Sequence, residues 1–79
     1  MSTLVTVRYW AGARRAAGRD SEQLSATTLN DLRAQLAARP ALTDVIASSS
    51  ILVDSVASRD DIALPNGAII DVLPPFAGG

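Results

Sequence analysis

The C-terminal end of the chain holds the residues best suited to chemistry. Residues 72–79 read VLPPFAGG, in which an apolar stretch is followed by two prolines, one aromatic residue, an alanine and two glycines. Prolines bias the backbone toward extension, and glycines carry no Cβ that would block entry into a narrow channel. The carboxylate of Gly79 sits on an unbranched residue, open to a nucleotide phosphate and then to a sulfur donor. We therefore expect Gly79, with Gly78 beside it, to be the reactive end of the chain.

Side-chain chemistry elsewhere in the sequence is sparse. The chain has neither cysteine nor histidine, which removes disulfides, thiolate metal sites, cysteine nucleophiles and the commonest general base. The acidic pair Asp60-Asp61 lacks the spaced companions that a hard cation needs, and the run Ser48-Ser49-Ser50 has no histidine or lysine to activate a hydroxyl. Both segments are expected to be solvated loops. We expect no metal, no bound cofactor and no active-site pocket of the chain's own.

Composition limits the kind of protein further. The 79 residues have room for a single domain over residues 1–79, and 48% hydrophobic with 19% charged residues indicates a packed core. Seven arginines, eight acidic residues and no lysine give a net charge of -1, which offers no basic footprint for nucleic acid or for a membrane surface. No apolar stretch approaches the roughly 20 residues of a membrane span, and no signal-peptide pattern opens the sequence. We expect a cytoplasmic protein.

The N-terminal third of the chain predicts two strands and a short helical turn. Residues 3–10 alternate as a half-buried strand does. One face of this strand carries Val5, Val7 and Tyr9, and the other carries Leu4, Thr6, Arg8 and Trp10. Residues 11–18 are rich in alanine and end on Gly18, which is typical of a helical turn with a glycine stop. Residues 19–26 are polar, and Leu24 supports a second strand that returns beside the first.

The middle of the chain predicts the main helix. Thr28 is a candidate N-cap with Asp31 three residues later, and the helix is expected to end near Arg39-Pro40. Its apolar stripe consists of Leu29, Leu32 and Leu36. A further helical turn is expected around Leu42, Val45 and Ile46.

The C-terminal third predicts the remaining strands. Residues 51–53 and the stretch around Val56 flank a turn at Asp54-Ser55, and Pro65-Asn66-Gly67 opens a last strand over residues 68–73. The resulting order, β-β-α-β-β, gives an α+β domain with a mixed sheet and one main helix packed across one face. Because proline cannot donate to a sheet, residues 74–79 are expected to form a flexible tail that projects into solvent.

Large apolar side chains near the tail predict a surface for a partner protein. The alternation places Trp10 opposite the expected core, and exposed tryptophans are typical of interface anchors, although a core position is the alternative. If the last strand lies beside the first, Ile69 shares this surface. Arg14 is either a contact to an acidic patch of the partner or a solvated charge. The predicted partner-binding residues are Trp10, Arg14, Leu73, Pro74, Pro75, Phe76 and Ala77.

Motifs along almost the whole chain resemble those of one known family. They are Tyr9-Trp10-Ala11, the alanine- and arginine-rich turn through Arg14 and Gly18, the leucine-patterned helix, Leu52-Val53-Asp54, Leu64-Pro65-Asn66-Gly67 and residues 71–79. Together they resemble the sulfur-carrier proteins with a ubiquitin-like β-grasp fold, most closely the small subunit of molybdopterin synthase. The last nine residues are the specific part of this resemblance.

The resemblance implies a function for the terminal glycine. In that family an E1-like activating enzyme adenylates the terminal glycine with ATP, and the product becomes a thiocarboxylate. By resemblance, Gly79 carries sulfur that is delivered, inside the large synthase subunit, to a cyclic pyranopterin in molybdenum cofactor biosynthesis. The chain would then be a non-catalytic sulfur-donor subunit, in a heterotetramer of two small and two large subunits.

Two alternatives stay open at this point. The first is a sulfur carrier for thiamine or cysteine biosynthesis, and the second is a ubiquitin-like modifier that is conjugated to other proteins. A chain without lysine cannot form isopeptide chains on its own side chains, which weakens the modifier alternative. The Pro-Pro stretch followed by a bulky residue favours the molybdopterin group.

Overall fold

The first strand, β1 (Leu4–Tyr9), forms as the alternation predicts. Val5, Val7 and Tyr9 are buried, whereas Leu4 and Trp10 are 45% and 46% exposed. The computed structural model describes residues 3–75 of the chain. The predicted assignment of the two faces of this strand is confirmed.

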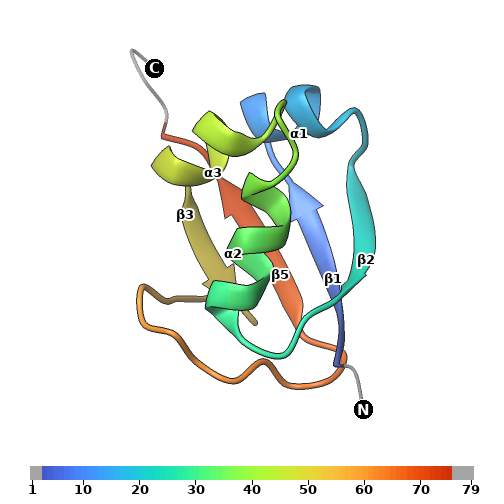
Figure 1. Ribbon diagram of the computed structural model, residues 1–79, viewed down its shortest axis with the longest axis vertical. Coiled ribbons are helices and arrows are strands. Elements are labelled where there is room, and N and C mark those ends of the chain that lie inside the picture. The colour runs from blue at the N-terminus through green and yellow to red at the C-terminus, as the bar shows by residue number, and fades with distance from the viewer. Residues whose placement is uncertain (1–2, 76–79) are drawn as a thin grey trace.

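A five-stranded mixed sheet surrounds β1. Strand β2 (Ser21–Ser25) pairs with it antiparallel on one side, and β5 (Ile69–Leu73) pairs with it parallel on the other. Strand β3 (Ser50–Val53) is antiparallel to β5, and the two-residue strand β4 (Val56–Ala57) is antiparallel to β3. The order across the sheet is β2-β1-β5-β3-β4 (Figure 1). The last strand therefore occupies the centre, beside the first, which is the condition under which Ile69 is expected to share the surface of Trp10.

Strand β4 is the one strand that the predicted order does not count. Asp54 and Ser55 have φ angles of 48° and 71°, so two successive residues are left-handed, as in the two-residue turns that join tight hairpins. Asp tolerates this conformation better than most residues. The predicted turn is confirmed, and it brings Val56 opposite Val53 as a short fifth strand.

Two short helices lie beyond the ends of β1 and β5 that point toward the top of Figure 1. Helix α1 (Gly12–Ala17) ends on Gly18, whose φ of 75° is left-handed and whose N–H donates to the carbonyl of Arg14. Helix α3 (Thr43–Ser48) is the further helical turn predicted from the sequence. Both predictions are confirmed.

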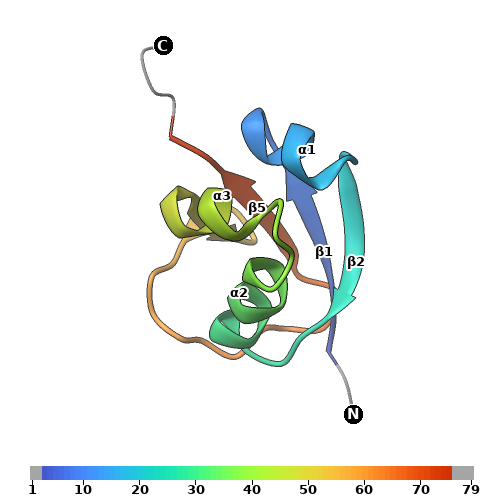
Figure 2. The ribbon, with the colours of Figure 1, turned by 45° about the horizontal axis from the view of Figure 1, so that its top comes forward.

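The main helix, α2 (Leu29–Ala37), crosses one face of the sheet (Figures 1 and 2). Thr28 Oγ1 accepts a hydrogen bond of 3.1 Å from the backbone N–H of Asp31, while the Asp31 carboxylate accepts one from Thr27 N. This reciprocal cap satisfies N–H groups that have no partner within the helix. The predicted stripe is the buried face: Leu29, Leu32 and Leu36 are each at most 1% exposed.

The core lies between α2 and the sheet, and a polar network closes one side of it. Glu22, on the inward face of β2, accepts two hydrogen bonds from Arg39, of 2.6 and 2.7 Å, and one of 2.6 Å from the Tyr9 hydroxyl. Hydrogen bonding to Arg39 is the main reason that the pKa of Glu22 falls from 4.5 to about 2. Burial and the bond to Glu22 raise the pKa of Tyr9. The network ties the chain after α2 to the first hairpin.

The turn that starts β5 is anchored to the start of β1. Asn66 Oδ1 accepts a hydrogen bond of 2.9 Å from Leu4 N, and Gly67 N donates to the Leu4 carbonyl. Gly67 has a φ of 84°, which a side chain would strain. The parallel register of β5 on β1 is thereby set at its first residue. Among residues 3–75, no helix is long and apolar enough to cross a membrane.

Candidate functional site

The tail leaves the domain from its central strand. β5 is hydrogen-bonded on both sides, with Val72 opposite Tyr9 on β1 and Leu73 opposite Ser50 on β3. Trp10 N extends this pairing by donating to the Val72 carbonyl at 3.3 Å. Pro74 is partly buried and Pro75 is exposed, and neither can donate to a neighbouring strand. The backbone is therefore hydrogen-bonded in the sheet through Leu73, and this pairing ends at the prolines.

The predicted reactive end lies beyond this point. Phe76, Ala77, Gly78 and Gly79 are outside the described residues. The assignments of Gly78 and Gly79 to chemistry, and of Phe76 and Ala77 to partner binding, remain predictions from the sequence. The structure describes the strand β5 and the two prolines that precede these residues.

A buried carboxylate lies on the sheet face that α2 leaves uncovered. Asp71, in the middle of β5, is 4% exposed. Arg8 donates two hydrogen bonds to its carboxylate, from Nε at 2.7 Å and from Nη2 at 2.9 Å. The Trp10 indole Nε1 donates a third, at 2.9 Å. The Arg8 guanidinium also lies over the indole ring, 5.8 Å from its centroid. Three side chains from two parallel strands thus form one rigid unit beside the origin of the tail.

The electrostatics of this unit keep Asp71 charged. The hydrogen bonds from Arg8, helped by the bond from Trp10, outweigh the effect of burial and hold the pKa of Asp71 below its ordinary value. The same pairing raises the pKa of Arg8. Because a bidentate guanidinium pair fixes both partners in direction, the indole is held in one orientation on the open face.

Apolar side chains surround this unit. By strand register, the face that carries Asp71 also carries Leu4, Leu52, Ile69 and Leu73. Leu4 is 45% exposed, and the other three are partly buried. We call Leu4, Trp10, Leu52, Ile69 and Leu73 the open-face patch. Trp10 and Leu73 lie side by side at the end of β1 and β5 from which the tail starts, so two of the seven predicted partner-binding residues are brought together.

Arg14 lies at the rim of a neighbouring hollow. This hollow of about 260 Å³ is lined by Arg8, Trp10, Arg14 and Asp20, among others. Arg14 Nη1 is 3.7 Å from Asp20 Oδ1, and both side chains are well exposed. The hollow brings Arg14 next to Trp10 but does not reach Leu73 or the prolines. The role of Arg14 as a partner contact remains a prediction.

Arg8 and Asp71 are site residues that the sequence reasoning missed. The available signal is a lone acid inside the apolar stretch AIIDVL, at a position whose neighbours two residues away, Ile69 and Leu73, share its face. An acid in a central strand needs a partner. Identifying that partner requires the parallel register, which pairs Arg8 with Asp71 directly.

Metal ligands do not gather in the described part of the chain. Within residues 3–75, no group of three or more aspartates, glutamates, histidines or cysteines is arranged to hold an ion. The acidic pair predicted to be a loop is exposed, and Asp61 accepts a hydrogen bond from Asn30 N at the start of α2. The Asp61 carboxylate thus serves the helix terminus.

Solved structures of proteins from several organisms share this fold. The small archaeal modifier protein 1 of Methanosarcina acetivorans matches with a TM-score of 0.84 and 28% identity, over 100% of this chain and 99% of that one. A putative molybdopterin converting factor subunit 1 from Pyrococcus furiosus matches with a TM-score of 0.83 and 26% identity, over 94% and 99%. Subunit 1 in a complex of subunits 1 and 2 of the Helicobacter pylori molybdopterin-converting factor matches with a TM-score of 0.80 and 24% identity, over 98% and 100%.

These neighbours confirm the predicted ubiquitin-like β-grasp fold. A search of curated protein sequences found no match. The sequence model of the ThiS family matches residues 7–79, which is nearly the whole chain, including the tail. Family and neighbours together place the function among sulfur carriers and the ubiquitin-like small archaeal modifiers. The chain belongs to the ThiS family.

Proposed function

We propose that this protein is the sulfur-donor subunit of a molybdopterin synthase and that Gly79 carries the sulfur. The observation that carries the proposal is the sequence VLPPFAGG leaving the central strand β5. A tail on a central strand is held on both sides up to Leu73 and is extended by prolines after it. Such a tail loses less conformational entropy on entering a channel than a flexible one does.

The proposed chemistry takes place at the terminal carboxylate. In the first step, an oxygen of the Gly79 carboxylate attacks the α-phosphorus of ATP in an activating enzyme, and pyrophosphate leaves. In the second step, a sulfide-level sulfur nucleophile (HS⁻) attacks the acyl carbon of the resulting adenylate, AMP leaves, and a thiocarboxylate remains. In the third step, the thiocarboxylate sulfur attacks a carbon of a cyclic pyranopterin and displaces an oxygen leaving group. Water then cleaves the acyl–sulfur bond of the resulting thioester, so that the sulfur stays on the pyranopterin and the Gly79 carboxylate is restored. This chain provides the carrier group and no acid or base.

The proposed partner is a large synthase subunit that covers the open-face patch. Trp10 and Leu73 of the patch lie at the end of β1 and β5 from which the tail continues, so one partner can contact both the patch and the tail. The patch contains the indole of Trp10, which is hydrogen-bonded to Asp71 at 2.9 Å, and preoriented aromatic anchors are typical of binding hot spots. The similar Helicobacter pylori subunit 1 is in a complex with subunit 2, which supports a partner of this kind.

An intact-mass measurement tests the carrier chemistry. The protein is incubated with ATP, a sulfur donor and a cognate activating enzyme, and the expected mass gain equals the difference between one sulfur and one oxygen atom. Omitting ATP is the control, because the acyl adenylate cannot form without it. A chain that gains no sulfur in the complete mixture would contradict the proposal.

A second assay identifies the pathway. The thiocarboxylated protein is combined with a large synthase subunit and the pyranopterin precursor, and molybdopterin is measured. Formation of thiazole, with no binding to the large subunit, would move the assignment to thiamine biosynthesis and leave the claim about Gly79 intact.

A protein modifier is the second candidate function. The observation in its favour is the 28% identity over the whole chain with the small archaeal modifier protein of Methanosarcina acetivorans. If this candidate is right, an antibody against the chain detects a ladder of larger conjugates in cell extracts, and deletion of Gly79 removes the ladder. A sulfur carrier alone gives a single band.

A further inference from the structure

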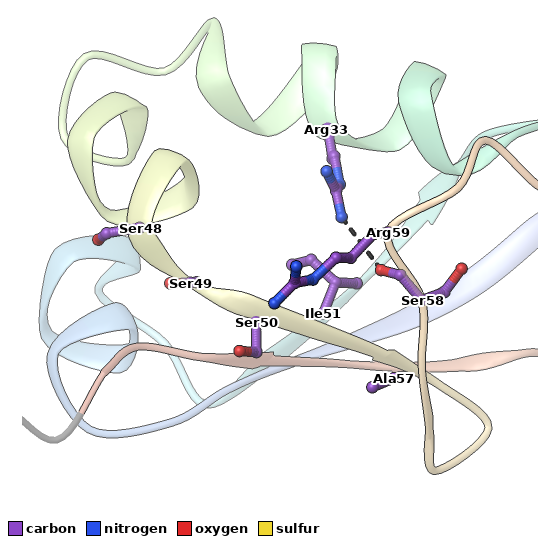
Figure 3. A pocket seen from close by; sticks show the side chains of 8 residues that line it. All are labelled: Arg33, Ser48, Ser49, Ser50, Ile51, Ala57, Ser58 and Arg59. Carbon is purple, nitrogen blue, oxygen red and sulfur yellow. Dashed lines mark hydrogen bonds between the residues drawn. The ribbon is translucent and has the colours of Figure 1, made fainter.

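A second hollow lies on the helix-covered side of the sheet. It has a volume of about 400 Å³ and is enclosed by α2, the end of α3, the start of β3 and the loop after β4 (Figure 3). Its lining includes Arg33, Ser49, Ile51, Ala57, Ser58 and Arg59. This volume is within the range of pockets that hold small molecules. Neither the tail nor the open-face patch contributes a described residue to it.

Arg33 brings an unsatisfied donor to this hollow. Its side chain descends from the middle of α2, and Nη2 donates to the Ser58 carbonyl at 3.2 Å. Its Nε is buried and has no hydrogen-bond partner within the described residues. A buried N–H of a charged group without an acceptor is costly and uncommon in folded proteins. An acceptor beside this donor, either a water molecule or a bound anion, would satisfy it.

Arg59 adds a second positive charge to the same space. Figure 3 shows its side chain reaching across the hollow toward Ser49 and Ser50, and Arg33 lines the same hollow. Within residues 3–75, neither Arg33 nor Arg59 has a carboxylate at salt-bridge distance, whereas Arg8, Arg14, Arg19 and Arg39 each have one. No acidic residue lines the hollow. Two guanidiniums that share a concave surface without a counter-charge favour an anion.

Hydroxyl groups at the rim complete a site for oxygen ligands. The bond from Ser58 Oγ to the Asp60 carbonyl is 3.4 Å long, beyond the usual range for such bonds. This hydroxyl can therefore turn toward an anion with little loss. Ser49 Oγ donates to the Val45 carbonyl at 2.5 Å and serves the end of α3 instead. The polar donors available to a ligand thus include the two guanidiniums and the hydroxyls of Ser50 and Ser58.

We propose that this hollow binds a tetrahedral oxyanion, the phosphate group of a small molecule. Guanidinium forks match phosphate oxygens in a bidentate manner, and two of them balance the charge of a phosphate dianion. A single carboxylate would leave one guanidinium without a partner. The proposal rests on Arg33, Arg59 and the hydroxyls beside them and is independent of the chemistry proposed for Gly79.

The test is an NMR titration of the whole protein at constant ionic strength. The probes are inorganic phosphate, pyrophosphate and ATP, with acetate as the carboxylate comparison. We expect saturable shifts of the Arg33 Nε–H signal and of the Ser58 and Arg59 amides. Tightest binding of inorganic phosphate identifies a single phosphate group as the ligand, and tighter binding of pyrophosphate or ATP identifies a polyphosphate; both support the site. Equal binding of acetate would overturn the assignment to phosphate.

Variants separate this site from general attraction to positive charge. Arg59→Gln is expected to weaken phosphate binding roughly tenfold, because it removes a charge-assisted pair. Arg59 is an exposed loop residue, so this variant keeps the fold even if Arg33→Gln does not. Arg15→Gln is the matched control, since Arg15 is an exposed arginine on α1. The proposal is wrong if Arg15→Gln weakens binding as much as Arg59→Gln, or if no probe gives saturable shifts.

Discussion

The indole Nε1 of Trp10 donates a hydrogen bond of 2.9 Å to Oδ1 of Asp71, across the parallel pair β1 and β5. The bond joins an exposed aromatic side chain to a buried carboxylate on the face that the helix leaves open. Without this hydrogen bond, the indole could rotate more freely at the C-terminal end of β1. With it, a large apolar surface is held in one orientation where the tail begins.

Replacement of Trp10 by alanine is expected to affect binding more than stability. The side chain is 46% exposed, so its loss should lower the free energy of unfolding by about 1 kcal/mol, the value of one hydrogen bond. Loss of an interface anchor should cost about 2 kcal/mol or more of affinity for the large subunit. Urea unfolding and calorimetric titration measure the two effects. A stability loss of about 3–5 kcal/mol with unchanged affinity would make Trp10 a core residue.

Arg8 and Asp71 should respond unequally to replacement. Arg8→Met leaves the buried carboxylate with the indole as its remaining side-chain donor, so this variant should be clearly destabilised. Asp71→Leu frees an arginine that water can solvate and places an apolar side chain between Ile69 and Leu73, so it should be milder.

The double variant Arg8→Met, Asp71→Leu tests the cause of this asymmetry. It should recover most of the stability lost in Arg8→Met, because no unpaired charge remains. Unfolding midpoints in urea rank the three proteins. If the double variant is no better than Arg8→Met, the buried charge is not the source of the loss.

The Glu22 network should make stability depend on pH in the acid range. The folded-state pKa of Glu22 is about 2 and its ordinary value is 4.5, so the unfolded chain takes up the proton first as pH falls. The stabilisation is complete above pH 4.5 and is lost progressively down to pH 2. We expect a loss of about 2 kcal/mol from this group, since Arg39 is partly solvated and screened.

Glu22→Gln is the control for this pH dependence. It removes the titrating group and nearly preserves its shape, so the free energy of unfolding should fall less steeply with acid than in the unchanged protein. Urea titrations at a series of pH values provide the comparison. Identical slopes for the two proteins would assign the acid sensitivity to other carboxylates, Asp71 among them, whose pKa is also lowered.

Deletion of Gly79 should separate function from fold. The described domain ends its last strand at Leu73, so the thermal unfolding temperature of the shortened chain should be unchanged. Thiocarboxylate formation should be abolished, because the activated carboxylate would then lie on Gly78, one residue short of the reacting position. A deleted chain that still acquires and delivers sulfur would refute the role of Gly79.

The sequence by itself determined the local elements of this protein. The alternation in residues 3–10, the cap at Thr28 and the stop at Gly18 each depend on residues within one turn or strand, and each is confirmed. Such elements can be predicted from the sequence because backbone sterics and short-range hydrogen bonds act over a few residues. The family could be recognised from the sequence for a different reason, because its specific motif is the continuous stretch of the last nine residues.

Only the tertiary structure decided which distant side chains meet. Arg8 and Asp71 are joined by the parallel pairing of the first and last strands, and Glu22 meets Arg39 because α2 crosses the sheet. Arg33 and Arg59 come from a helix and a loop that share a hollow. Each pair depends on how two elements pack, and many packings satisfy the same local patterns. The physical reason is that register and packing are set by the whole core, whereas caps and alternation are set by near neighbours.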